Sequence, residues 1–253
     1  MPTTITGDSP KREQRLQQLL LGRIEQRFER RLSAEIRRAM NEAADDLENG
    51  FQPNIEGTHR SRLNALLREL WDQSARLLSS RILGEQRSAR GPYHLKEVTP
   101  TQIMDGVMSE WIAVYGTEKI TQITRTTQES IRTIITSGIQ GGISEREIAK
   151  RIKEIAPTKS ASRAQTIART EVHASANASA QFSAEATGIE MRREWVASGG
   201  ERTRTDHADA DGQVVGMNEP FIVGGSELRY PGDPLAPAAQ SINCRCAVAY
   251  VVE

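Results

Sequence analysis

The sequence predicts a mostly α protein with a small α+β C-terminal domain, in which long amphipathic helices precede a small β-sheet backed by a helix. Apolar residues recur every three to four positions in separate stretches up to about residue 155, which is the period of a helix with one buried face. Aromatic residues are only 4% of the chain and mean hydropathy is −0.52, as is typical of long solvated helices. Glycine, proline and both cysteines gather after residue 200, where we expect tight turns and short strands.

The first predicted helix covers residues 10–48 and ends at Asn49-Gly50, with Gly50 as the residue that closes it. A second helix is expected from about residue 58 to 83. We expect the apolar stripe of the first helix to stay exposed and to dock on a partner. That stripe consists of Leu16, Leu20, Ile24, Phe28, Leu32, Ile36 and Met40.

A break is expected over residues 84–100, which contain Gly91-Pro92. A third helical region follows over 100–137, where Gly116 is a candidate interruption, and residues 138–142 form a flexible joint. Ser144 and Glu147 have the spacing of a capping box and start a short helix. We expect Pro157 to end that helix and Ser160 to start another, which runs to Gly188.

Strands are expected at 190–197, 214–215, 221–222 and 246–252, because these stretches are apolar, β-branched or alternating. The small residues over 174–180 would let another backbone approach the helix that precedes them. We therefore divide the chain into a helical assembly arm over 1–99, a helical connector over 100–137 and a C-terminal domain over 138–253. Gly212 and Gly232 are predicted to occupy turns with positive φ.

The formal net charge is zero, which argues against a strongly cationic nucleic-acid binder, but the first helix is rich in arginine. Its exposed face could contact DNA phosphates or an acidic partner, or could be an ordinary solvated face with internal Glu–Arg pairs. The arginines concerned are Arg12, Arg15, Arg23, Arg27, Arg30, Arg31, Arg37 and Arg38.

Several classes of protein do not fit the sequence. No stretch approaches the roughly 18 apolar residues of a membrane span, so we expect no membrane partner. The N-terminus lacks the pattern of a secretory signal, and two cysteines do not make a disulfide framework. We therefore expect synthesis in a reducing cytoplasm, with both cysteines reduced and buried.

His207, Cys244 and Cys246 carry the side chains that zinc prefers, so zinc is a possible cofactor. A fourth ligand would have to come from Asp206, Asp209 or Asp211, and the Cys-x-Cys spacing is tighter than in most zinc knuckles. Inert packing of two buried thiols and a redox pair are the alternatives.

His207 with a nearby carboxylate, above all Asp211, is a candidate acid–base pair. The alternative is a hydrogen-bonded turn, in which Asx side chains bind the backbone. The sequence contains no nucleophile elbow, P-loop or zinc-protease motif, so we expect no enzyme. Arg169 and Glu171 lie in a helix and are expected either to clamp the C-terminal module near Trp195 or Asn243, or to be solvated.

The C-terminal half, roughly residues 100–253, resembles the phage Mu F-like minor head proteins, also called head morphogenesis proteins. No single motif is specific, but their order and spacing are. The residues that carry the resemblance include Arg169, Thr170, Glu171, Trp195, His207, Asp211, Gly212, Pro231, Gly232, Pro234, Asn243, Cys244 and Cys246.

The resemblance implies a minor structural component of a tailed-phage head, bound near the portal or the inner capsid surface during procapsid assembly. It implies a location in the virion, after assembly in the host cytoplasm, and possible contact with packaged DNA that bears on DNA ejection. It transfers no enzymatic mechanism, and no further effector domain is expected after residue 253. Self-association of the long helices stays open, as do a DNA-binding role and a metal-dependent or hydrolytic role centred on His207.

Overall fold

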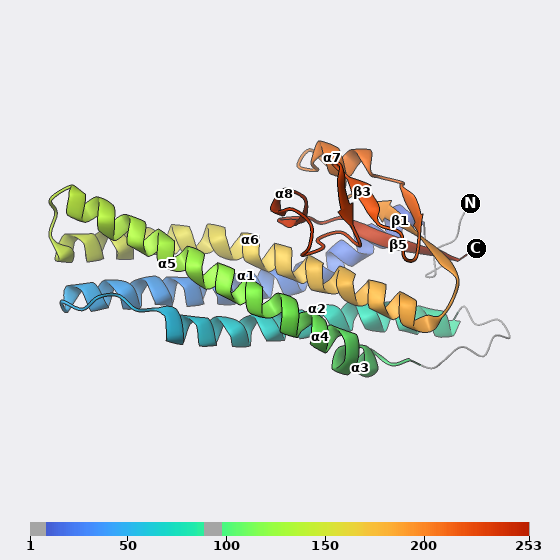
Figure 1. Cartoon of the computed structure of the whole chain (residues 1–253), viewed down its shortest axis with the longest axis horizontal. Helices are drawn as coiled ribbons and strands as arrows, with labels where there is room; N and C mark the ends of the chain where they lie inside the picture. Colours follow the sequence, from blue (N-terminus) through green and yellow to red (C-terminus); the bar gives the residue numbers. More distant parts are fainter. Residues whose placement is uncertain (1–8, 89–97, 253) are drawn as a thin grey trace. The chain divides into compact units, whose positions relative to one another are not determined.

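The computed structural model describes residues 9–88 and 98–252 (Figure 1). Helices make up most of this part of the chain, and a small antiparallel sheet follows them, so the predicted fold class is confirmed. The predicted Gly91-Pro92 break and the N-terminal segment before residue 9 lie outside the described residues. No helix in the described ranges combines the length and apolarity needed to cross a membrane.

The first two helices are α1, Pro10–Glu48, and α2, Glu56–Ser88. Gly50, at φ 75°, follows α1 as the sequence predicted. The prediction that the apolar stripe of α1 is exposed and docks on a partner is wrong, because its central members Ile24, Phe28 and Leu32 are at most 7% exposed. The chain's own side chains cover this stripe, so it belongs to the core.

The connector is helical but irregular. Thr99 caps α3, Pro100–Ile103, through a capping box with Gln102. Two π turns, η1 at Met104–Met108 and η2 at Ile112–Gly116, flank α4, Ser109–Trp111, and α5 continues over Thr117–Gln140. The second π turn ends at Gly116, where the sequence predicted an interruption, whereas the non-helical φ and ψ at Gly106 were not predicted.

Helix α6 runs without interruption over Glu145–Thr187, so the predicted stop at Pro157 and start at Ser160 are wrong. Its start agrees with the prediction, since the Ser144 hydroxyl accepts the N–H of Glu147 at 3.3 Å. Pro157 is exposed, whereas Ile152, Ala156 and Ser160 are fully buried. The continuous buried face on both sides of the proline outweighs the one backbone hydrogen bond that proline removes.

In the described part of the chain, five strands follow α6. In the three-stranded sheet, β1, Met191–Val196, lies between β2, Val214–Gly216, and β5, Ala247–Val252, and both pairings are antiparallel. Strands β3, Phe221–Val223, and β4, Ser226–Leu228, form a separate hairpin. The short helices α7, Thr205–Asp209, and α8, Ala238–Ser241, stand in the loops. The sequence predicted four of the five strands but missed β4, α7 and α8.

By their internal contacts, the residues form two compact units. The first contains residues 1–25, 70–111 and 169–253, and the second contains 26–69 and 112–168. In the second unit, the Glu35 carboxylate accepts hydrogen bonds from Arg62 at 2.8 Å and from His59 at 2.9 Å, and Arg163 donates to the carbonyl of Ile123. The first two bonds join α1 to α2, and the third joins α6 to α5.

In the first unit, serines on α2 and α6 bring the two helices close together. Ser74 and Ser175 share a hydrogen bond of 2.7 Å, and Ser179 donates to the carbonyl of Ala75 at 2.8 Å. Strands β1 and β5 lie beside the C-terminal half of α6 (Figure 1), where the Gln181 side chain accepts from Arg193. The small residues of this stretch therefore admit close neighbours, as predicted.

Gly212 and Gly232 have φ values of 81° and 78°, so both predicted turn positions are confirmed. A Cβ on Gly232 would lie 3.4 Å from the Cα of Ala174, so this turn rests against the backbone of α6. Both cysteines are free and buried, as expected.

Candidate functional site

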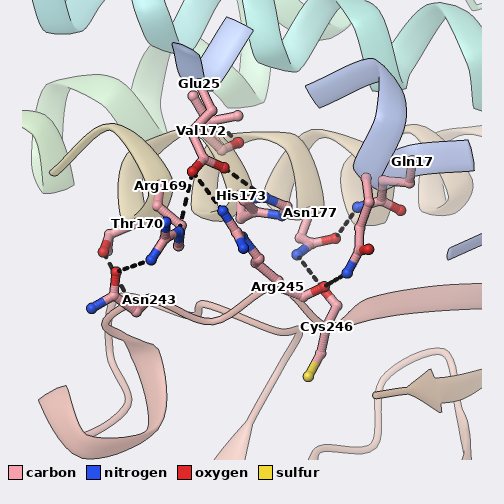
Figure 2. A network of polar contacts seen from close by, with 12 residues as sticks. Gln17, Glu25, Arg169, Thr170, Val172, His173, Asn177, Asn243, Arg245 and Cys246 are labelled. Carbon is pink, nitrogen blue, oxygen red and sulfur yellow. Dashed lines mark hydrogen bonds and ion pairs between the residues drawn. The ribbon is translucent and has the colours of Figure 1, made fainter. Parts of the chain in front are cut away.

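An ion cluster joins the first and last parts of the chain within the first unit. Glu25 of α1 is 7% exposed, and one of its oxygens lies 3.1 Å from Arg169 Nε and 2.7 Å from an Arg245 guanidinium nitrogen (Figure 2). His173 Nε2 lies 3.7 Å from the other oxygen. We call Glu25, Arg169, His173 and Arg245 the clamp.

The clamp holds a charged carboxylate in a buried place. Burial by itself would raise the pKa of Glu25, but hydrogen bonds from His173 and Arg245 outweigh it and lower that pKa from 4.5 to about 2. Glu25 is therefore ionised at neutral pH, and its charge is balanced mainly by α6 and by the segment before β5. A carboxylate with several fixed partners is a joint between segments rather than a reactive group.

Asn243 extends the clamp. Its backbone N–H donates to the Thr170 hydroxyl at 3.0 Å, and its side-chain oxygen accepts from Arg169 at 3.3 Å (Figure 2). Its φ is 58°, a left-handed conformation that asparagine tolerates better than most residues. Arg169 therefore binds the C-terminal module at Asn243, as the sequence predicted. Glu171 instead accepts from the indole of Trp71 at 3.1 Å.

Asn177 is a second joint between α6 and the turn-rich module. Its side-chain amide donates to the carbonyls of Pro231 at 2.9 Å and Cys246 at 3.2 Å, and its oxygen accepts from Gln17 of α1 at 2.9 Å (Figure 2). The residue is 2% exposed. One buried amide thus satisfies groups on three segments that are distant in sequence.

His207, Cys244 and Cys246 lie together, as the sequence allowed. His207 Nδ1 is 3.4 Å from Cys246 Sγ and 3.7 Å from Cys244 Sγ, and each of the three residues is at most 3% exposed. A hydrogen bond from the Cys244 thiol lowers the pKa of Cys246, with a further contribution from His207, while the same bond and burial raise the pKa of Cys244. These three are the described residues that could hold a metal ion together.

The carboxylates proposed as partners of His207 have other roles. Asp211 accepts the backbone N–H of Ala197 at 2.8 Å and binds Lys11 at 2.6 Å. Asp206 accepts from the Gln240 amide, and Asp209 is exposed on α7. None of the three belongs to the cluster of His207, Cys244 and Cys246 in the described residues, so the expected fourth ligand and the His207–Asp211 acid–base pair are not formed.

The other motif residues build the core around this cluster. Trp195 is fully buried, and its indole meets the His207 ring edge to face at 5.6 Å between ring centres. Pro231 and Gly232 are buried and Pro234 is half-buried, in a turn that Asp233 fixes through the backbone and guanidinium of Arg229. These motif residues thus have structural partners within the domain.

The arginines of α1 are exposed, except for the half-buried Arg31. Some take part in contacts within the chain: Arg31 pairs with Glu69 at 2.6 Å, and Arg38 pairs with Glu42 at 3.0 Å. The expected internal Glu–Arg pairs are therefore present, while much of the positive surface still faces solvent.

Several residues that organise this region carry little recognisable signal in the sequence. Glu25 looked like one charge among many on α1, and Gln240 and Asn177 carried no motif. Arg193 is 2% exposed and donates to the carbonyls of Gly216 at 3.1 Å, Arg229 and Glu219, and to Gln181. The one signal for Arg193 was its place on the inward-facing side of a period-2 strand.

The comparisons with known proteins point to one family for this region. The family described as phage Mu protein F like protein matches residues 129–249. The minor head protein GP7 of Bacillus phage SPP1 is 34% identical over 127 residues, which cover 49% of this chain and 41% of GP7. No solved structure matches the chain.

Two bacterial relatives align with it as well. The uncharacterized protein YqbB of Bacillus subtilis is 27% identical over 216 residues, which are 83% of this chain and 63% of YqbB. The NAD(+)–arginine ADP-ribosyltransferase EFV of Enterococcus faecalis is 30% identical over 128 residues, which are 49% of this chain and 26% of EFV. The chain thus spans less than two thirds of the length of each of these relatives. Residues 129–249 contain the clamp's Arg169, His173 and Arg245 and the cluster of His207, Cys244 and Cys246, and it is this part of the chain that is similar to the phage Mu protein F-like family and to the SPP1 minor head protein.

Proposed function

We propose that this chain acts in phage head morphogenesis as a minor structural protein of the head, located in the virion near the portal vertex or on the inner capsid surface. The match of the Mu F-like family to residues 129–249, together with the likeness to the SPP1 minor head protein, carries this proposal. A structural role also agrees with the clamp, which devotes its charged groups to joining segments of the chain.

We propose that this structural protein has no enzymatic activity. His207 is 2% exposed and its ring nitrogens face Gln240 and the two thiols, so a substrate has no access to it in this arrangement. The best carboxylate candidate, Asp211, is held by Lys11 and by a backbone amide. EFV is named for an ADP-ribosyltransferase activity, but the part of EFV that aligns with this chain is only 26% of EFV.

Attachment to the portal or capsid would use exposed apolar side chains other than the α1 stripe. Leu235, in the turn before α8, is 81% exposed, and Val114, in η2, is 79% exposed. They belong to different units, so they test two separate surfaces. An exposed leucine or valine that a partner covers gives up its contact with water on binding.

Co-expression with portal and capsid proteins, followed by isolation of procapsids, tests the proposal. We expect the chain to co-purify with procapsids at far fewer copies than the capsid protein. Leu235→Asp or Val114→Asp should reduce this co-purification while the melting temperature stays unchanged. The proposal fails if the folded wild-type chain never associates with procapsids or with the portal.

Contact with packaged DNA is part of the same proposal, supported by the exposed arginines of α1. Binding to duplex DNA should weaken with salt, with a log–log slope of about −0.9 for each phosphate contacted. The double variant Arg23→Gln and Arg37→Gln should make that slope less steep. Arg38→Gln is the matched control, because Arg38 already pairs with Glu42. A mobility shift that does not depend on salt, or no shift at low salt, rules out DNA contact.

A further inference from the structure

We propose that His207, Cys244 and Cys246 bind a zinc ion that fastens the C-terminal module together. The three ligand atoms lie within 4.8 Å of one another, although His207 is 37 residues away from Cys244 in the sequence. His207 comes from α7, and the two cysteines come from the segment that leads into β5. An ion at this point would join two segments of a region that contains only short strands and helices.

The hydrogen bonds around His207 present the correct nitrogen. The Asp206 carboxylate can only accept, so the Gln240 side chain must turn its amide nitrogen toward it, as the 2.8 Å contact shows. The Gln240 oxygen then faces His207 Nε2 at 3.0 Å and requires a proton on that nitrogen. The proton on Nε2 leaves the lone pair of Nδ1 directed at the two sulfur atoms. Histidines that bind metals are fixed in this manner by a partner on the other ring nitrogen.

The distances fit a tetrahedral ion. Zinc lies about 2.3 Å from a thiolate and about 2.0–2.1 Å from an imidazole nitrogen, so tetrahedral angles place nitrogen and sulfur about 3.6 Å apart. The observed separations from Nδ1 are 3.4 Å and 3.7 Å, on either side of that value. Two thiolates and a divalent cation also sum to zero charge, which suits a site where every ligand is at most 3% exposed.

Simple packing of two buried thiols explains the position of His207 less well than zinc binding does. A cysteine buried as a small apolar side chain needs no imidazole, and this imidazole is oriented by a relay through Gln240 to an exposed carboxylate. The relay occupies Nε2 and aims Nδ1 at both sulfur atoms. Three protein ligands leave one position of a tetrahedral ion, which water can fill.

The test is the metal content of the full chain, expressed without a polyhistidine tag. After incubation with Zn²⁺ and desalting, we expect about one zinc ion per chain, and a lower melting temperature after removal by a chelator. Co²⁺ in place of Zn²⁺ should give an intense thiolate charge-transfer band and the visible absorption of a tetrahedral site. Substoichiometric zinc in the folded wild-type chain, together with no thiolate band from Co²⁺, overturns the proposal.

Variants distinguish zinc binding from simple packing of the two thiols. Cys244→Ser and His207→Asn should lose the Co²⁺ band, and Asp209→Asn, an exposed carboxylate on the same α7, should keep it. Gln240→Ala should fold and bind Zn²⁺ about 10- to 100-fold more weakly, because it removes the partner of Nε2 without removing a ligand. A Gln240→Ala protein with unchanged Zn²⁺ affinity contradicts the role of the relay. A mass showing a Cys244–Cys246 disulfide in the protein from a reducing cytoplasm contradicts the site itself.

Discussion

The Arg245 guanidinium lies 2.7 Å from the Glu25 carboxylate, which joins residues 220 positions apart in the chain. Arg245 stands between the two cysteines just before the last strand, and Glu25 lies within the first helix. The first part of α1, up to Glu25, therefore belongs to the same structural unit as residues 169–252, which contain Arg169, His207 and the two cysteines. Arg245, although it stands between two buried thiols, thus has a charged partner on α1.

Arg245→Met should destabilise the chain by about 2 kcal/mol, because it keeps the aliphatic stem and removes one partner of a buried carboxylate. Urea unfolding followed by circular dichroism measures the change. Arg202→Met, an exposed arginine of the same module, is the control and should change stability by no more than about 0.5 kcal/mol. Equal effects of the two substitutions would show that the clamp contributes nothing measurable.

Acid should weaken the clamp in a defined range of pH. The pKa of Glu25 is lowered from 4.5 to about 2 in the folded chain, so the stabilisation is complete above pH 4.5 and is lost as pH falls toward 2. The shift corresponds to about 3 kcal/mol at most. Glu25→Gln should therefore flatten the dependence of unfolding free energy on pH in this range. Parallel wild-type and Glu25→Gln curves between pH 5 and pH 2 would contradict the assignment.

Gly224 and Gly225 form a matched pair in the turn between β3 and β4. Their φ values are 55° and 76°, so alanine at either position costs about 1 kcal/mol in backbone strain. A Cβ on Gly224 would also lie 2.4 Å from an Asp206 carboxylate oxygen and 2.6 Å from the Gln240 amide nitrogen, whereas Gly225 has nothing within 4 Å. Gly224→Ala should thus lower the melting temperature more than Gly225→Ala. The reverse order would contradict the packing of Gln240.

Pro157→Ala tests the continuity of α6. Within a continuous helix, alanine restores a backbone hydrogen bond and removes a steric clash, so we expect stabilisation of up to about 3 kcal/mol. Pro157 is exposed, so its side chain makes little contribution to packing. If the chain actually turned at this residue, alanine would loosen the unfolded state and the variant would be neutral or less stable. Thermal unfolding of the two proteins decides the matter.

Local patterns predicted the long helical stretches, four of the five described strands and the turns at Gly212 and Gly232, because period and backbone preference act over a few residues. They failed at Pro157, where burial on both sides outweighs the propensity of one residue. They also failed on the α1 stripe, since a one-sided apolar face does not reveal whether its cover is the same chain or another.

The motif residues were found as a set, but their roles were not. The proximity of His207 to Cys244 and Cys246 depends on the fold of the loops that carry α7 and α8, which have no local signal. The pairing of Glu25 with Arg245 likewise joins an ordinary helical charge to a distant segment. Gln240 was missed because a glutamine in a loop shows nothing of its role until its partners, His207 and Asp206, are placed.

The most direct test of a role in head morphogenesis is quantitative mass spectrometry of purified heads from a phage that encodes this chain. We predict that the chain is present in heads at far fewer copies than the major capsid protein, and in a fixed ratio to the portal. Heads that lack the chain, although infected cells contain the folded protein throughout assembly, would contradict the account.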